Sequence, residues 1–359
     1  MTGAFVTVIA EAGVNHNGST KLALQLVDAA ADAGADVVKF QTFKASAIVT
    51  RQSAKADYQT RTTDADERQL EMLRALELGE EAHAEIIARC KARQVRFLST
   101  PFDFESLILL VDHFGLEEIK IGSGELTNAP LLLSAAQTGR SVILSTGMGT
   151  LGEIEMALGV LAFGYLERND RPSRAAFIDA FASPEGRAVL AGKVTLLHCT
   201  TEYPAPFSDV NLRAMDTMRA AFGLPVGFSD HTSGIAVAIA AAARGATVIE
   251  KHLTLDRTMA GPDHMASLEP AEFAAMIASI RDVEAALGEA IKAPAPSERK
   301  NVAIARKSLV AAHTIAAGET FTPENLAIKR PGNGTSPIEY WDILGRVATR
   351  AFDPDESIS

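Results

Sequence analysis

Cysteine, tryptophan and basic charge are all scarce in this sequence. Only two cysteines, Cys90 and Cys199, occur among 359 residues. Two isolated thiols exclude a disulfide framework and favour a reducing compartment. No run of about 18 apolar residues occurs, so no membrane-spanning helix is predicted. The first residues, MTGAFVTVIAE, carry no basic segment ahead of an apolar one. We therefore expect no export signal and a cytoplasmic protein.

The charge balance limits the class of partner. Lysine and arginine number 34 against 45 acidic residues, which gives a net charge of -11. Without a basic tract, a nucleic acid is not an expected partner. An anionic small molecule remains compatible, because a few local lysines can outweigh a distant negative surface. Apolar residues make up 47% of the chain, and its length suggests about two domains.

Short apolar runs alternate with amphipathic helical patterns along most of the chain. Runs this apolar, separated by helices, are typical of a parallel sheet covered by helices. Eight such units in roughly 285 residues predict a (β/α)8 barrel. A doubly wound open sheet is the alternative, but it seldom needs eight regular repeats. The predicted strands span residues 5–10, 36–41, 95–100, 118–123, 141–146, 193–199, 225–230 and 247–252.

Every predicted strand ends in polar side chains. One polar strand end could be a local cap, but the carboxyl ends of barrel strands share one rim, where active sites are built. Eight polar ends therefore predict a catalytic face. Its candidate residues are Glu11, Lys39, Gln41, Ser99, Thr100, Lys120, Ser123, Glu125, Ser145, Thr146, His198, Thr200, Ser229, Asp230, His231, Glu250, Lys251 and His252.

Two lysines stand inside otherwise apolar strands. A buried lysine needs an anionic partner, and for Lys39 and Lys120 that partner is either a glutamate, Glu11 or Glu125, or a bound anion. The neighbouring segments GSGE (122–125) and STGMGT (145–150) supply hydroxyls and glycines that let backbone N–H groups approach an oxyanion. Together these features favour a small molecule with a phosphate and a carboxylate.

Two histidines follow adjacent predicted strands. His231 comes after the seventh strand and His252 ends the eighth, so both imidazoles could bind one divalent metal. The alternative is a hydrogen bond to a neighbour, such as Asp230 for His231. His16 and His264 lie in predicted loops, where a histidine can serve as a turn donor.

The composition changes after residue 288. A Pro/Ala/charged segment, 289–300, reads as a linker between a barrel domain, 1–288, and a small domain, 301–359. The latter contains short strands and turns, and its segments TIAAGETFT (314–322) and AFDPDESIS (351–359) resemble one another as parts of one β unit. Within the barrel, residues 164–192 read as a long polar connection.

Nine motifs in order give the chain a family resemblance: IAEAGVNHNGS, ADVVKFQTFKA, FLSTPFD, KIGSGELTN, ILSTGM, HCTTEYPAPFSDVNL, GFSDHTSG, IEKHLTLDRTMAGPDHMASLEP and KRPGNG. Together they resemble bacterial sialic acid synthases, within the wider nonulosonic acid synthases, from about residue 3 to the end. The C-terminal segment resembles the antifreeze-like (SAF) domain. The resemblance implies a transferase that condenses phosphoenolpyruvate with N-acetylmannosamine or a related amino sugar and releases phosphate by C–O cleavage. It also implies a divalent metal, Mn²⁺ ahead of Mg²⁺ or Co²⁺.

The resemblance also implies roles for individual residues. His231 and His252 match metal ligands, and Glu125 matches a carboxylate beside the reacting carbons. Glu11 or Glu125 would transfer the proton. Arg330 matches an arginine that one subunit inserts into the barrel of its partner, which implies a domain-swapped homodimer. The positions that match phosphoenolpyruvate contacts are Lys39, Thr100, Lys120, Ser123, Ser145 and Ser229, and those around the sugar are Glu11, Gln41, Tyr203, Glu250 and Asp263.

Three other interpretations stay open. HCTTEYPAP is shared by sialate-forming and legionaminate-forming relatives, so 2,4-diacetamido-2,4,6-trideoxymannose is an alternative acceptor. A Schiff-base aldolase on the same barrel would use Lys39, Lys120 or Lys251 as its nucleophile. A non-catalytic sugar-binding protein would depend on the antifreeze-like domain instead.

Overall fold

The structure, a computed structural model, describes residues 5–56, 60, 63, 67–168 and 170–359. The chain divides into two compact units, Met1–Gly288 and Glu289–Ser359, which are described separately below.

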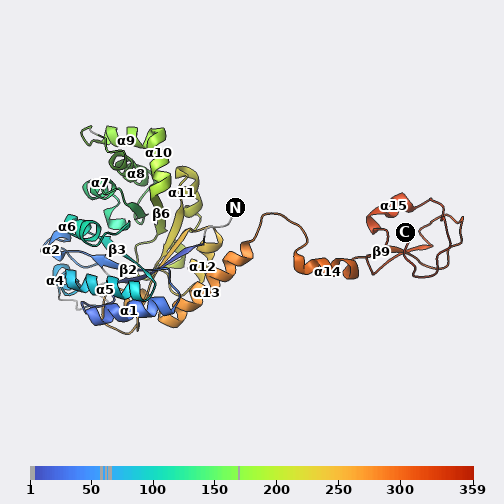
Figure 1. The fold of residues 1–359 in the computed structure, drawn as a ribbon, viewed down its shortest axis with the longest axis horizontal. Coiled ribbons are helices and arrows are strands. Elements are labelled where there is room, and N and C mark those ends of the chain that lie inside the picture. Colours follow the sequence, from blue (N-terminus) through green and yellow to red (C-terminus); the bar gives the residue numbers. More distant parts are fainter. Residues whose placement is uncertain (1–4, 57–59, 61–62, 64–66, 169) are drawn as a thin grey trace. The chain divides into compact units, whose positions relative to one another are not determined.

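The first unit contains a sheet of eight parallel strands surrounded by helices (Figure 1). Hydrogen-bonded neighbours follow the order β3-β2-β1-β8-β7-β6-β5-β4, and β3 also contacts β4, so the sheet closes into a barrel. This arrangement confirms the predicted (β/α)8 fold. The strands are β1 (Thr7–Gly13), β2 (Val37–Thr42), β3 (Arg96–Pro101), β4 (Glu118–Ile121), β5 (Ser141–Ser145), β6 (Val194–Cys199), β7 (Val226–Asp230) and β8 (Val248–His252).

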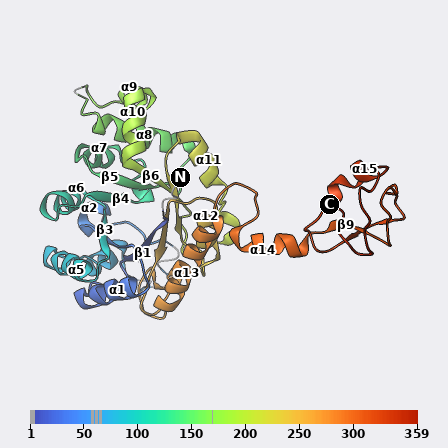
Figure 2. The ribbon, with the colours of Figure 1, turned by 45° about the vertical axis from the view of Figure 1, so that its right-hand side comes forward.

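Helices form the outer layer, and Figure 2 shows them around the strands from a second direction. In the first of them, buried Ala23, Leu26, Val27 and Ala30 form one apolar face, and the Ser19 hydroxyl caps the start by accepting from the Leu22 N–H. The helices are α1 (Thr20–Asp32), α2 (Ala45–Ile48), α4 (Gln69–Ala75), α5 (Glu80–Ala92), α6 (Phe104–Ile108), α7 (Ala129–Gln137), α8 (Leu151–Tyr165), α9 (Arg174–Ala182), α10 (Pro184–Lys193), α11 (Ala214–Phe222), α12 (Ala236–Ala243) and α13 (Pro270–Leu287).

A single apolar layer fills the interior of the barrel below the site. It consists of Ile9, Val37, Leu98, Ile143, Leu197 and Val248. Gly227 completes the packing, since a Cβ there would lie 2.4 Å from the Val248 carbonyl oxygen. Side chains two residues apart on a strand face the same way. Two residues beyond this layer the inward positions are therefore the polar ones: Glu11, Lys39, Thr100, Ser145 and Glu250.

The long polar connection expected at 164–192 is in fact largely helical, since α9 and α10 occupy it and pack against α8. Both helices begin at serine caps: the Ser173 hydroxyl accepts from the Ala176 N–H, and the Ser183 hydroxyl accepts from the Gly186 N–H. They bury few side chains, chiefly Ala180 and Leu190. The prediction missed the apolar run within α9, whose Phe177 and Phe181 pack against the main core of the barrel.

The second unit is a small β-rich module with its own apolar core. Strands β9 (Ser308–Ala311) and β10 (Leu326–Lys329) pair antiparallel, and α15 (Tyr340–Ile343) follows. The two similar segments meet where Ile315 and Phe352 exchange backbone hydrogen bonds of 3.0 and 2.9 Å. The core consists of Leu309, Ala311, Ile315, Phe321, Leu326, Ala348, Phe352 and Ile358.

The predicted linker is only partly irregular. Helix α14 (Pro296–Ala305) begins within it, because Pro296 suits a first helical turn and the Glu298 carboxylate accepts from the Ala295 N–H at 2.9 Å. Across the described part of the chain, none of the helices has the length and apolar character that a membrane crossing requires.

Candidate active site

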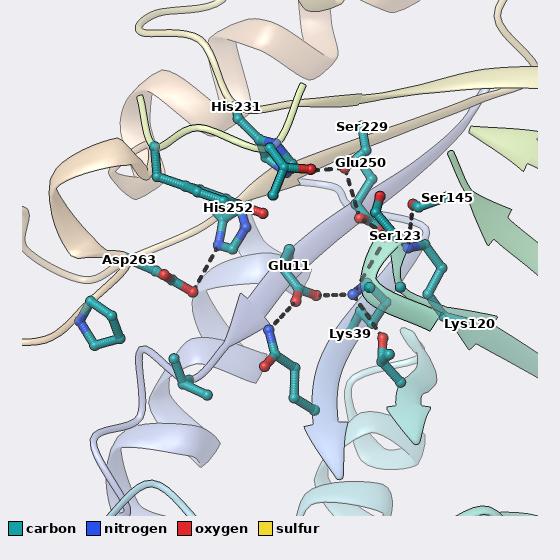
Figure 3. Close-up of a pocket in the computed structure, with 18 of the residues that line it drawn as sticks. Glu11, Lys39, Lys120, Ser123, Ser145, Ser229, His231, Glu250, His252 and Asp263 are labelled. Carbon is teal, nitrogen blue, oxygen red and sulfur yellow. Dashed lines mark hydrogen bonds and ion pairs between the residues drawn. The ribbon is translucent and has the colours of Figure 1, made fainter. Parts of the chain in front are cut away.

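A cavity of about 240 Å³ opens at the carboxyl ends of the barrel strands. Figure 3 shows its polar side chains converging from several strands. The cavity gathers most of the predicted site residues. The rim candidates that do not line it are Ser99, Thr146, His198, Thr200, Asp230, Lys251 and Glu125. The predicted residues that line the cavity are Glu11, Lys39, Gln41, Thr100, Lys120, Ser123, Ser145, Tyr203, Ser229, His231, Glu250, His252 and Asp263.

Lys39 and Lys120 lie deep in this cavity, each only 3% exposed. The Lys39 ammonium is 2.7 Å from Glu11 Oε2 and donates to Thr100 Oγ1 at 3.2 Å. The Lys120 ammonium donates to Ser145 Oγ at 2.6 Å. Glu250 stands between the lysines, 3.7 Å from one and 3.6 Å from the other (Figure 3). Two cations therefore share two carboxylates.

The two carboxylates differ in pKa. Burial raises the pKa of Glu11 to about 7, against the opposing effect of Lys39. Burial acts in the same direction on Glu250, but Lys120 and Lys39 together outweigh it and hold that pKa at about 2. Near neutral pH, the two lysines thus face Glu250, which is ionised, and Glu11, which is partly protonated. This arrangement leaves positive charge available for an anion.

The lysines differ as well. Burial would lower the pKa of Lys39, but Glu11 and Glu250 reverse the shift and raise it. For Lys120, burial prevails over the attraction of Glu250, so its pKa is lowered. A bound phosphate or carboxylate beside Lys120 would favour its charged form.

A hydroxyl and a backbone amide meet at the edge of the cavity. Ser123 Oγ accepts from the Gly147 N–H at 2.9 Å and lies 3.2 Å from Cys199 Sγ. A Cβ at position 147 would lie 2.5 Å from Thr201 Oγ1 and 2.8 Å from Ser123 Oγ. Glycine is needed there because the backbone approaches these side chains so closely.

The two predicted metal ligands are neighbours on the other side of the cavity (Figure 3). The ring centroids of His231 and His252 are 5.6 Å apart. Tyr203 packs beside them, with its ring centroid 4.3 Å from that of His231. Burial lowers the pKa of both imidazoles, so they are neutral at physiological pH. Neutral imidazoles are the form that binds a metal.

The hydrogen bonds of these histidines suit a divalent ion. His231 Nδ1 lies 2.6 Å from the Thr200 carbonyl oxygen, a backbone bond that orients the ring and leaves Nε2 free to act as an acceptor. His252 Nδ1 is buried without a hydrogen-bond partner among the described residues, and Asp263 Oδ2 lies 3.8 Å away. No group of three or more histidine, cysteine or acidic side chains in the described ranges is arranged around one metal position. The residues therefore fit a two-histidine site completed by water or substrate oxygens.

A second ion pair lies behind the cavity. Lys251 and Asp230 are fully buried and 2.9 Å apart. Because they alternate with Glu250 and Ser229 along β8 and β7, they face away from the barrel interior, and neither lines the cavity. Lys251 also donates to the carbonyl oxygen of Thr232. This placement removes Lys251 from the candidates for a Schiff-base nucleophile.

Two residues predicted from the family resemblance lie elsewhere in the chain: Glu125 is not among the residues that line the cavity, and Arg330 belongs to the second unit, which is described separately. Glu125 belongs to the short helical turn after β4, and its carboxylate accepts from the Asn128 side chain at 2.6 Å, which holds it against the following helix. Arg330 is exposed in the second unit. Of the loop histidines, His16 Nδ1 accepts from the Gly18 N–H, and His264 Nδ1 lies 2.7 Å from Thr254 Oγ1.

Apolar residues form a part of the cavity that the sequence did not indicate. Met72, Leu73 and Leu76, in and just after α4, line it together with Val14 and Phe102. Their pattern is that of ordinary core residues, so only the position of α4 above the strand ends reveals them. Thr201 and Cys199 also line the cavity without having been proposed for it.

The fold and this cavity together define a (β/α)8 barrel with a candidate active site at its usual place. Residues 26–292 match the model of the NeuB family, and residues 306–359 match that of the SAF domain. The chain therefore belongs to the NeuB family, which confirms the family resemblance seen in the sequence.

Several relatives of the chain are named as synthases of nonulosonic acids. The chain is 50% identical to the N,N'-diacetyllegionaminic acid synthase of Campylobacter jejuni, over 98% of both chains. It is 42% identical to the enzyme of that name from Legionella pneumophila, over 94% of this chain and 89% of that one. A solved sialic acid synthetase from Leptospira borgpetersenii, in complex with citrate, matches with a TM-score of 0.65 and 32% identity, over 83% of this chain and 90% of that one.

Proposed function

We propose that the protein condenses phosphoenolpyruvate with 2,4-diacetamido-2,4,6-trideoxymannose, forming N,N'-diacetyllegionaminic acid and inorganic phosphate. The observation that carries the proposal is the pair of buried lysines, Lys39 and Lys120, facing one ionised carboxylate in a cavity next to two neutral histidines. Identity favours this acceptor over N-acetylmannosamine: 50% and 42% to the legionaminic acid synthases against 32% to the sialic acid synthetase. The proposal thus adopts what the sequence offered only as the alternative acceptor.

The lysines would bind the phosphoenolpyruvate. Lys39 and Lys120 would supply positive charge for its phosphate and carboxylate. Hydroxyl groups come from Thr100, which accepts from Lys39, from Ser145, which accepts from Lys120, and from Ser123, which accepts from the Gly147 N–H. When the anion binds, the lysines would keep part of their contact with Glu250. The Glu250 carboxylate is held in place because it also accepts a hydrogen bond from Ser229 at 2.9 Å. Binding of this kind contributes to the rate by positioning and by electrostatic stabilisation.

The reaction forms one C–C bond and breaks one C–O bond. The methylene carbon of phosphoenolpyruvate attacks the aldehyde carbon of the open-chain sugar, whose oxygen takes up a proton. Water adds to the cationic C2 and loses a proton. The tetrahedral carbon then expels phosphate by C–O cleavage, as the new hydroxyl loses its proton to form the ketone and the leaving phosphate takes up a proton. Glu11 is suited to these proton transfers, because a pKa of about 7 lets it both donate and accept near neutral pH.

His231 and His252 would hold a divalent ion, for which Mn²⁺ is our first choice. Such an ion supplies Lewis-acid polarisation of a carbonyl oxygen. Gln41, whose amide donates to Glu11 at 3.2 Å, and Asp263, whose pKa burial raises to about 6, would contact the sugar.

Arg330 would act in the barrel of a second copy, so we also propose a domain-swapped homodimer. Support comes from the family resemblance of KRPGNG and from the exposure of Arg330 in its unit. Mixing an Arg330→Ala chain with a Lys120→Met chain tests this proposal. If each variant alone is inactive, the mixture should recover part of the activity, because one of its two sites would combine intact residues. A dimer that never recovers activity would contradict the exchange.

The deciding experiment measures phosphate release from phosphoenolpyruvate with Mn²⁺ and either sugar. We expect faster turnover with 2,4-diacetamido-2,4,6-trideoxymannose than with N-acetylmannosamine, and a loss of turnover with EDTA. Release should also depend on the protonation state of Glu11, so kcat/KM should change through pH 7 and Glu11→Gln should abolish that dependence. A pyruvate adduct trapped by borohydride, with activity surviving EDTA, would instead indicate an aldolase.

A further inference from the structure

The cavity has two contrasting surfaces. Its floor is charged and consists of Glu11, Lys39, Lys120 and Glu250, whereas one of its walls is apolar. Met72, Leu73 and Leu76 line it from α4 and the residue after it, and Phe102 lines it from the end of β3. Met72 and Leu76 are buried and belong, with Val14, to an apolar cluster distinct from the main core of the barrel. The wall is therefore a continuous apolar surface carried by the connections after β1, β2 and β3.

The floor and the wall come from different levels of the barrel. Lys39 and Lys120 belong to the strands themselves, one step above the apolar interior layer. Helix α4 belongs to the connection between β2 and β3, beyond the strand ends. The cavity therefore offers two kinds of surface, a charged one on the strands and an apolar one in the connections after them.

We propose that Met72, Leu73 and Leu76 form the subsite for the C6 methyl group of a 6-deoxy sugar and so determine the choice of acceptor. The inference rests on the proposed condensation, in which C1 of the open-chain sugar must reach the phosphoenolpyruvate held by the lysines. C6 is the opposite end of that chain. A methyl group against the wall removes apolar surface from water, whereas a hydroxyl there loses hydrogen bonds to water.

The expected preference is moderate. An apolar pocket discriminates against an isostere that adds one hydroxyl by at most about 100-fold, because it can withhold a hydrogen bond but has room for the oxygen. We therefore expect the full-length protein to favour a 6-deoxy acceptor by about 10- to 100-fold in kcat/KM.

The test uses two acceptors that differ in a single oxygen, N-acetylmannosamine and 2-acetamido-2,6-dideoxymannose. Phosphate release with Mn²⁺ gives the ratio of their kcat/KM values. In Met72→Gln, which nearly keeps the side-chain volume, an amide faces the C6 position, and the ratio should fall about 10-fold. Leu73→Gln should lower it too, and because Leu73 is only half-buried, this variant serves if Met72→Gln does not fold.

Ile48→Gln is the matched control. Ile48 packs against the same apolar cluster but is not among the residues that line the cavity, so its replacement should leave the ratio unchanged. A ratio that stays at the wild-type value in the folded wall variants, or that falls equally in Ile48→Gln, overturns the subsite and leaves the condensation intact. No phosphate release by the wild-type protein, with these sugars or with 2,4-diacetamido-2,4,6-trideoxymannose, overturns both.

Discussion

The two units of the chain place their charges in opposite ways. In the first unit, Lys39, Lys120 and Lys251 are all buried, each within reach of a carboxylate. In the second unit, the ion pair between Lys329 and Asp355 lies on the surface, with side chains 51% and 67% exposed. The core of that unit is apolar. Both modules are compact, but only one keeps charge inside.

This difference separates the demands of stability from those of chemistry. Burying a salt bridge seldom adds stability over a well-packed apolar pair, because desolvation offsets the attraction. The second unit follows that rule. The first unit departs from it around its cavity, where Lys39 and Lys120 share the carboxylates of Glu11 and Glu250. Interior charge therefore marks the unit that holds the candidate active site.

The largest expected effect comes from breaking the buried pair behind the cavity. Asp230→Asn leaves the Lys251 ammonium without its counterion and should lower the free energy of unfolding by about 3–5 kcal/mol. Asp355→Asn, in the exposed pair, should cause no measurable change. Urea unfolding followed by circular dichroism measures both. Equal effects of the two substitutions would contradict the contrast between the units.

A companion variant tests whether charge itself is needed at that position. Replacing both partners, as in Asp230→Leu with Lys251→Met, should recover most of the lost stability, because no unpaired charge remains. The double variant also shows whether the pair serves to hold the strands that carry His231 and His252. In that case Mn²⁺ binding, measured by electron paramagnetic resonance, weakens even though stability returns.

A smaller effect, on the free energy of transition-state binding, is expected when Lys120 on the cavity floor is replaced by an uncharged residue. Lys120→Met should lower kcat/KM for phosphoenolpyruvate by about 100- to 1,000-fold, since one preorganised donor is removed. Lys307→Met, at an exposed lysine of the second unit, should leave kcat/KM within about twofold. Steady-state phosphate release provides the comparison. Comparable losses in both variants would mean that net charge, rather than the cavity, governs binding.

The smallest expected effect is the loss of stability of the first unit as the pH falls. Burial lowers the pKa of His16 to about 4, and burial also lowers those of His83, His198 and His264. Between pH 6.5 and 4 the unfolded chain therefore binds protons that the folded first unit refuses, so stability falls as pH falls. At pH 5, His16 alone accounts for about 2 kcal/mol.

Two carboxyls act in the opposite direction over part of this range. The raised pKa values of Glu11, about 7, and Asp263, about 6, mean that the folded state binds their protons more tightly. Because more histidines than carboxyls are shifted, we expect a net loss of stability on acidification. Hydrogen exchange, corrected for its intrinsic pH dependence, should accelerate in peptides of the first unit. Peptides from 308–358 should accelerate less above pH 5, because the shifted groups of that unit, Glu319 and Glu356, are carboxyls with lowered pKa values, whose contribution is lost only in more acidic solution.

Much of the site could be predicted because the barrel imposes one rule on every strand. Inward positions repeat every second residue, so Ile9 and Glu11, or Val37 and Lys39, must face the same way. The rim residues follow from that rule once the strands are known. The same rule places Lys251 outside, because Glu250 and His252 flank it. Applied strictly, it would have excluded Lys251 as a nucleophile from the sequence alone.

The parts that escaped prediction lie outside the strands. Met72 and Leu76 have the spacing of ordinary core residues, and no local pattern distinguishes a side chain that faces a cavity from one that faces a helix. Glu125 stands in a turn whose direction depends on its bond to Asn128. Helices α9 and α10 are flanked by polar segments, and the apolar residues of α9, such as Phe177 and Phe181, are only partly buried, so the sequence was read as a polar connection.

The floor of the cavity rests on a single layer of side chains inside the barrel. The two lysines proposed to bind phosphoenolpyruvate, Lys39 and Lys120, thus belong to the strands, where a substitution disturbs the packing beneath. The apolar wall lies mainly on α4, a helix in the connection between β2 and β3. Such a connection can change in length or composition with little effect on the strands. If the proposed function holds, a barrel organised in this manner can acquire new sugar acceptors in the course of evolution while the residues that bind phosphoenolpyruvate stay the same.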